Sequence, residues 1–137
     1  MHPDLENIAE RIIAIAREHL AERGGFVPFA KAIQKNGDGL VVSVDQIEGA
    51  ENMMRALVDH LRVRAGRGEV RAIGVCVDVY TTPPGREEKA DSLSIRLEHA
   101  DGERAIMYVP YVLMTDGTYR FEDPFTKPAQ SSAVFEP

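Results

Sequence analysis

The chain has 137 residues, with 22 acidic and 16 basic side chains and a net charge of −6. This balance argues against binding to nucleic acids or anionic membrane surfaces, because both depend on Lys and Arg. The single cysteine, Cys76, excludes an internal disulfide and a cysteine metal cluster, and it fits a reducing cytoplasm. No apolar run approaches the roughly 20 residues of a membrane helix, and the N-terminus lacks the pattern of a signal peptide. We therefore expect a cytoplasmic chain that forms a single domain over residues 1–137.

Two segments have the apolar spacing of helices. The first begins at Pro3, which suits the first helical position, and is ended by Gly24. The second opens with a capping box formed by Asp45 and Glu48 and ends at Gly66. Apolar residues recur every three or four positions in both helices. These stripes are Leu5, Ile8, Ile12 and Leu20 in the first helix, and Ile47, Ala50, Met54, Leu57 and Leu61 in the second.

The remaining regular segments predict strands. FVPFAKAIQKNGDGLVVSV reads as a hairpin whose first strand opens after Pro28, where the missing N–H costs little. EVRAIGVCVDVYTT is apolar on both faces, which is typical of a central strand covered on both sides. SLSIRLEHADGERAIMYVPYVL is a second hairpin, followed by a polar turn and a short strand in DGTYRFED. The tail after it is irregular, but Phe125 and Phe135 indicate that it docks on the body.

These elements predict an α+β fold in the order α-β-β-α-β-β-β. Hairpin connections favour a largely antiparallel sheet. The simplest way to bury the two apolar stripes is to pack both helices on one face of that sheet.

The second hairpin contains two features that bear on a site. A two-residue turn at Asp101-Gly102 would place His99 opposite Arg104, where two potential cations could hold an anion. Alternatively, both residues lie in water at the hairpin tip. The same turn would place Ile95 opposite Tyr108 and Leu97 opposite Ile106.

Pro110 falls well inside the last strand of this hairpin, where a proline interrupts the ladder. We expect it to mark a β-bulge or a sheet edge, and a bulge would bring Tyr108 and Tyr111 to the same face. An edge at Pro110 and Tyr111 is the first place to look for a protein partner.

Other candidate groups each have a functional and a structural interpretation. Asp78 shares a strand face with Cys76 and Tyr80, so it could be a catalytic group with a shifted pKa. Alternatively, it marks the solvent-exposed end of the strand. The ligand or anion-binding candidates are Asp78, Tyr80, His99, Arg104 and Tyr108. No histidine pair has metal-ligand spacing, so no metal or cofactor is expected. A basic patch could receive an anion or complement a helix C-terminus; it consists of Arg62, Arg64, Arg67 and Arg71.

Several segments together resemble a known group. An N-terminal helix leads into FVPFA, the strand GVCVDVY precedes a loop, LEHADG forms a hairpin, and a later strand ends in VPY. This pattern resembles a group of small bacterial hypothetical proteins with no assigned activity. The resemblance implies a compact bacterial cytosolic protein, and it supplies no catalytic residues.

Two functions remain open. The absence of a nucleophile–base pair or a metal motif favours a non-catalytic interaction or regulatory module, such as an immunity or accessory protein, acting as a homodimer or on a protein partner. The alternative is a small-ligand-binding protein or enzyme with a pocket between the sheet and the proline-bearing strands.

Overall fold

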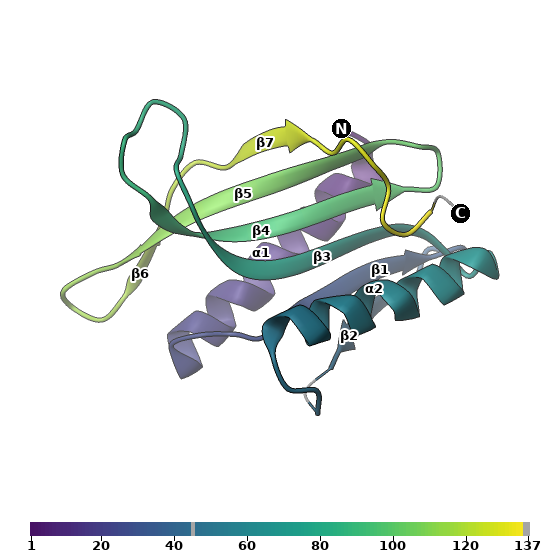
Figure 1. The fold of residues 1–137 in the computed structure, drawn as a ribbon, viewed down its shortest axis with the longest axis horizontal. Coiled ribbons are helices and arrows are strands. Elements are labelled where there is room, and N and C mark those ends of the chain that lie inside the picture. Colours follow the sequence, from purple (N-terminus) through teal and green to yellow (C-terminus); the bar gives the residue numbers. More distant parts are fainter. Residues whose placement is uncertain (45, 136–137) are drawn as a thin grey trace.

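The computed structural model describes residues 1–44 and 46–135. A seven-stranded antiparallel sheet has the order β2-β1-β3-β4-β5-β6, with β7 also paired to β5 (Figure 1). The predicted class and element order are confirmed, and short strands extend the sheet after β5. The helices are α1 (Pro3–Arg23) and α2 (Ala50–Gly66), and the strands are β1 (Phe29–Gln34), β2 (Gly39–Ser43), β3 (Val70–Thr81), β4 (Ala90–His99), β5 (Arg104–Leu113), β6 (Tyr119–Phe121) and β7 (Phe125–Pro128).

The ends of α1 follow the sequence signals, but the start of α2 does not. Pro3 opens α1, and Gly24 closes it with a left-handed φ of 74°. α2 begins only at Ala50, after Gly49 at φ 88°. The expected capping box therefore does not cap α2, and its first member, Asp45, lies outside the described residues. Neither helix in the described part of the chain is long and apolar enough to cross a membrane.

The two helices lie on opposite faces of the sheet, which corrects the expectation that they share one (Figure 1). Ala72 and Cys76 of β3 pack in the α1 cluster, whereas Ile73 and Val75 pack in the α2 cluster. The physical reason is the alternation of side chains along β3. Both faces of this strand are apolar, so each face needs its own cover.

Gly74 sets how closely α1 approaches the sheet. A Cβ at this position would lie 2.5 Å from Cγ2 of Ile8 and 2.8 Å from Cδ1 of Ile12. Real Cβ atoms do not come this close to other carbons, so any side chain at position 74 would push α1 away.

The C-terminal tail covers part of the α2 face by binding a buried carboxylate. Glu98 of β4 is 1% exposed. It accepts hydrogen bonds from Ser132 Oγ at 2.5 Å, from the backbone N–H groups of Ala133 at 2.9 Å and Val134 at 3.1 Å, and from Arg96 at 3.1 Å. Val134 is 2% exposed, so the expected docking of the tail is confirmed.

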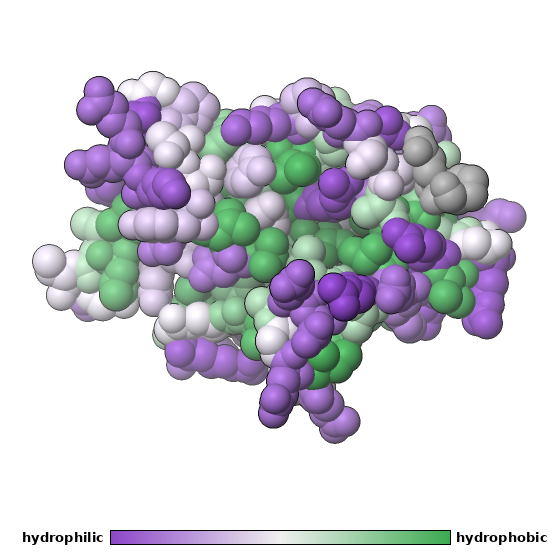
Figure 2. Space-filling model, in the orientation of Figure 1, coloured by the Kyte–Doolittle hydropathy of each residue, from purple (hydrophilic) through white to green (hydrophobic). Residues whose placement is uncertain are grey.

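The α2 face is only partly covered. Val77 and Val79 of β3 point to this face and remain half-buried. Figure 2 shows apolar side chains gathered along the middle of this side of the molecule, with hydrophilic ones around its rim.

The β4–β5 hairpin has a register one residue away from the expected one. Leu97 pairs with Ala105, Ile95 with Met107 and Glu98 with Arg104. Gly102, at φ 103°, donates to His99 O at 3.0 Å, and His99 N donates to Glu103 O at 2.8 Å. This is a type I turn followed by a glycine bulge rather than a two-residue turn. A shift of one residue reverses faces, so Arg104 and Tyr108 lie on the opposite face from His99.

We expect Gly74→Ala to lower the free energy of unfolding by about 1–3 kcal/mol, because the methyl group overpacks the contact with α1. Chemical denaturation measures this change. The matched control is Gly66→Ala at the end of α2, where nothing lies within 4 Å of the added Cβ. Adding Ile12→Val, which removes the Cδ1 atom that the new methyl group would meet, should recover part of the loss. An unchanged stability of Gly74→Ala would contradict the close approach of α1.

We expect Glu98→Gln to cost about 1.5–3 kcal/mol at pH 7, because a charged acceptor of several hydrogen bonds is lost. Burial raises the pKa of Glu98, but the hydrogen bonds from Ser132, Ala133 and Val134 outweigh it and lower the pKa. The ionised carboxylate therefore stabilises the fold above its unfolded-state pKa, and this contribution is lost as the pH falls.

Denaturation of both proteins across pH tests the idea, and the difference between them should shrink below about pH 4. Glu87→Gln, in the exposed loop before β4, is the control and should change little. A difference that persists unchanged in acid would rule out the carboxylate as its source.

Candidate functional site

The five candidate residues do not share one pocket. Asp78 lies on the α1 face near the end of β3, opposite Leu93, whereas His99 lies opposite Ala72 at the other end of the same strand pair. Six residues of strand separate these positions by about 20 Å. Arg104 and Tyr108 lie on the other face. Tyr80 is 66% exposed.

Asp78 is bound by a tyrosine from the core. The hydroxyl of Tyr111 donates to Asp78 Oδ1 at 2.8 Å, and Tyr111 is 6% exposed. Burial raises the pKa of Asp78, against the lowering effect of this hydrogen bond. Burial and the Asp78 carboxylate both raise the pKa of Tyr111. Cys76 is fully buried in the same face, and burial raises the pKa of its thiol, so it stays protonated.

His99 takes part in an ion cluster at the start of α1. Its Nε2 lies 3.0 Å from Asp4 Oδ2, and Arg71 donates to both oxygens of Asp4 at 3.0 and 3.2 Å. The bonds from Arg71 lower the pKa of Asp4 against the effect of burial, and His99 adds to the lowering. His99 is 10% exposed, so it is not a water-exposed tip residue, and the strand register places Glu98 rather than His99 opposite Arg104.

Three groups of this region have ligand atoms within 4.8 Å of one another: His2, His99 and Asp101. However, His2 Nδ1 accepts the N–H of Asp4, and His99 Nδ1 accepts the N–H of Asp101. The two rings are stacked at 3.8 Å with an angle of 24° between them. Lone pairs in nearly parallel ring planes do not converge on one point, so the arrangement does not favour a metal site.

The arginines of the basic patch are engaged in structural contacts. Arg62 donates to Ala133 O in the tail at 3.0 and 2.7 Å, and Arg64 and Arg67 pair with Glu69 after α2. Arg71 lies apart, on Asp4. Arg104 likewise holds the tail through Ala129 O at 3.0 Å.

Pro110 is buried rather than at an exposed edge, and so is Tyr111. β7 pairs with β5 as far as Tyr108, and β6 pairs from Tyr111 onward. Between these points, two residues of β5 face three residues of the outer strand, at positions 122–124. The expectation of a bulge within β5 is therefore wrong: the bulge lies in the outer strand, opposite Pro110, where that strand carries one extra residue.

This placement has two consequences. The carbonyl oxygen of Pro110 accepts a hydrogen bond from the backbone N–H of Glu122 at 2.8 Å. The nitrogen of Pro110, which has no hydrogen to donate, therefore points toward the same interrupted outer strand. β5 itself stays regular, and Tyr108 and Tyr111 point to opposite faces, which corrects the expectation that they share one.

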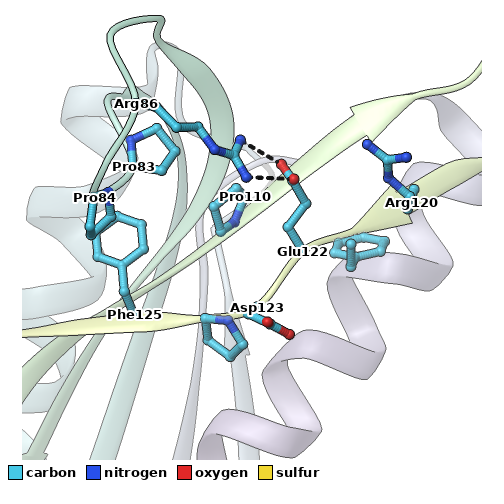
Figure 3. Close-up of a pocket in the computed structure, with 10 residues that line it drawn as sticks. Pro83, Pro84, Arg86, Pro110, Arg120, Glu122, Asp123 and Phe125 are labelled. Atoms are coloured by element: carbon cyan, nitrogen blue, oxygen red, sulfur yellow. Dashed lines mark hydrogen bonds and ion pairs between the residues drawn. The ribbon is translucent and has the colours of Figure 1, made fainter.

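The bulge opens a pocket of about 500 Å³, called the bulge pocket below. Figure 3 shows Pro83, Pro84, Pro110 and Phe125 around one space. Arg86 reaches from the 82–89 loop to Glu122, with hydrogen bonds of 2.9 and 2.6 Å (Figure 3). The pocket is lined by Pro83, Pro84, Arg86, Pro110, Arg120, Phe121, Glu122, Asp123, Pro124 and Phe125.

Sequence reasoning found only Pro110 of this pocket. Its other residues come from a loop and from strands far apart in the chain. The signal available was the concentration of proline in Pro83-Pro84 and Asp123-Pro124.

Comparison with known proteins gives no relative: no protein-family model, no curated protein and no solved structure matches the chain. The resemblance to bacterial hypothetical proteins therefore stays a prediction.

We expect Tyr111→Phe to raise the pKa of Asp78 further, because it removes the hydrogen bond that favours the carboxylate and leaves the effect of burial. Titration of the carboxyl carbon by NMR measures this pKa. Tyr80→Phe, two residues along β3 from Asp78, is the matched control and should leave it unchanged. A pKa that falls in Tyr111→Phe would contradict the assigned balance of effects.

Proposed function

We propose that this chain is a non-catalytic interaction module of the cytoplasm, which binds a short peptide segment of a protein partner in the bulge pocket. The observation that carries the proposal is the bulge at Pro110, which opens a pocket of about 500 Å³ beside the sheet. Bulges are common next to sites, where they re-aim side chains and end strand pairing.

The chemistry of the pocket walls favours an aromatic side chain as the anchor of that segment. Pro84 and Pro124 are exposed, and the Phe125 ring is half-buried. Proline and aromatic rings stack well on each other, and Tyr and Trp are the residues that most often anchor protein interfaces. The Arg86–Glu122 pair offers a donor and an acceptor to the backbone of the same segment.

The positions of the titratable groups also support a non-catalytic role. Asp78 and His99 lie about 20 Å apart along the strands. Cys76 is fully buried and holds its proton, which leaves no thiolate to act as a nucleophile.

Selection from a phage-displayed library of random peptides tests the proposal. Peptides enriched on the protein should carry Tyr or Trp, and Pro84→Ala should weaken their binding about tenfold, as expected for loss of a hot-spot contact. Val63→Ala, on the exposed side of α2, is the control and should bind as the parent does. Enriched peptides that bind Pro84→Ala as tightly as the parent, or no enrichment at all, would overturn the proposal.

A small-ligand-binding protein is the second candidate, because the volume of the bulge pocket lies in the range of small-molecule sites. A thermal-shift screen with aromatic fragments distinguishes the two. Under this alternative, fragments raise the melting temperature of the parent but not of Pro84→Ala, while no peptide is enriched.

A further inference from the structure

A second hollow separates the first turns of α1 from the β1–β2 hairpin. It has a volume of about 560 Å³, and its charged lining groups are Arg11, Lys31, Arg71 and Asp4. We call it the cationic groove. Three positive charges and one negative charge give it a net positive charge, in a chain whose overall charge is −6. We propose that the cationic groove binds the phosphate group of a small phosphate ester.

Arg71 is held in place for such a role. Asp4 accepts from its Nε at 3.0 Å and from its Nη2 at 3.2 Å, which fixes the plane of the guanidinium. The remaining nitrogen, Nη1, has only a long contact of 3.4 Å to Lys35 O. It lies on the side of Gly37, where an added Cβ would be 4.0 Å away. One edge of a fixed guanidinium therefore remains available to a ligand.

Asp4 offsets only one of the three positive charges of the groove. Its oxygens already bind Arg71 and His99. Within residues 1–44 and 46–135, Arg11 and Lys31 form no ion pair with a carboxylate. By contrast, the arginines at the end of α2 pair with Glu69 or bind the tail.

Gly39 makes room for the amine of Lys31. A Cβ on Gly39 would lie 2.5 Å from Lys31 Nζ and 3.3 Å from its Cε. Gly39 is not among the glycines with positive φ, so its backbone does not require glycine. The space above Gly39 is instead filled by the ammonium group, which this arrangement keeps at the groove.

A phosphate dianion suits this set of donors better than a carboxylate does. The guanidinium edge, the ammonium group and the exposed amide of Asn7 line one space and offer several donors to three phosphate oxygens. The groove is also larger than a phosphate ion, which leaves room for the esterified part of the molecule. Nucleic acid is disfavoured, because the overall charge repels a polyanion.

This site is separate from the bulge pocket and does not depend on the proposed function. The two share no lining residue: the groove lies at the β1–β2 end of the sheet and the pocket at the β5–β7 end.

Titration with inorganic phosphate and with glycerol 3-phosphate, followed by ¹H–¹⁵N NMR, tests the proposal. Sodium acetate at equal ionic strength is the reference for non-specific effects. We expect saturable shifts at residues lining the groove, with glycerol 3-phosphate binding at least as tightly as phosphate. Lys31→Gln and Arg11→Gln should each weaken binding about fivefold or more, and Gly39→Ala should weaken it by displacing the Lys31 amine.

Lys89→Gln is the matched control, because it removes the same charge from the exposed loop before β4, and its affinity should stay within twofold of the parent. Arg11 is exposed, so Arg11→Gln still tests the proposal if Lys31→Gln does not fold. The proposal would be overturned if Lys89→Gln weakened binding as much as the groove variants do. It would also be overturned if acetate caused the same shifts as phosphate, or if the saturable shifts lay outside the groove.

Discussion

The need to cover both faces of β3 governs this structure. Ala72, Gly74 and Cys76 point to one side of the strand, and Ile73 and Val75 point to the other. A strand with two apolar faces is stable only between two layers, so α1 and α2 must lie on opposite sides. Each helix is too narrow to cover the whole sheet. The tail therefore covers a further part of the α2 face, and it binds there through hydrogen bonds to Glu98.

The elements themselves were predictable because each depends on local chemistry. Helical spacing, Pro3, Gly24 and Pro28 identified α1 and the start of β1 correctly. The side of the sheet on which each helix packs was not predictable in the same way. An apolar stripe shows that a helix has a buried face but not which layer covers it. The presence of apolar residues on both faces of β3 did indicate it, because two apolar faces favour one helix on each side of the sheet.

The candidate site was harder to predict, because it depends on register. The DG pair at Asp101-Gly102 is compatible with a two-residue turn, but the chain forms a longer loop with a glycine bulge. The resulting shift of one residue moved Arg104 and Tyr108 to the face opposite His99, although Arg104 and His99 still line one small hollow at the end of the hairpin. Likewise, the contacts of Arg62 and Arg71 depend on the tail and on Asp4, which lie far from them in sequence. Long-range contacts of this kind leave no periodic signal.

Proline and charge together explain why both hollows lie away from the core. Pro110 withdraws one donor from the outer ladder, and the chain responds with an extra residue at positions 122–124. The Arg86–Glu122 ion pair then joins the 82–89 loop to the outer strand at this interruption. At the opposite end of the sheet, Asp4 orients Arg71, and the absence of a side chain at Gly39 leaves space there for the Lys31 amine. At the first place an interrupted strand, and at the second a missing side chain, determines where charged side chains lie. A chain that is acidic overall thereby presents one local region of positive charge.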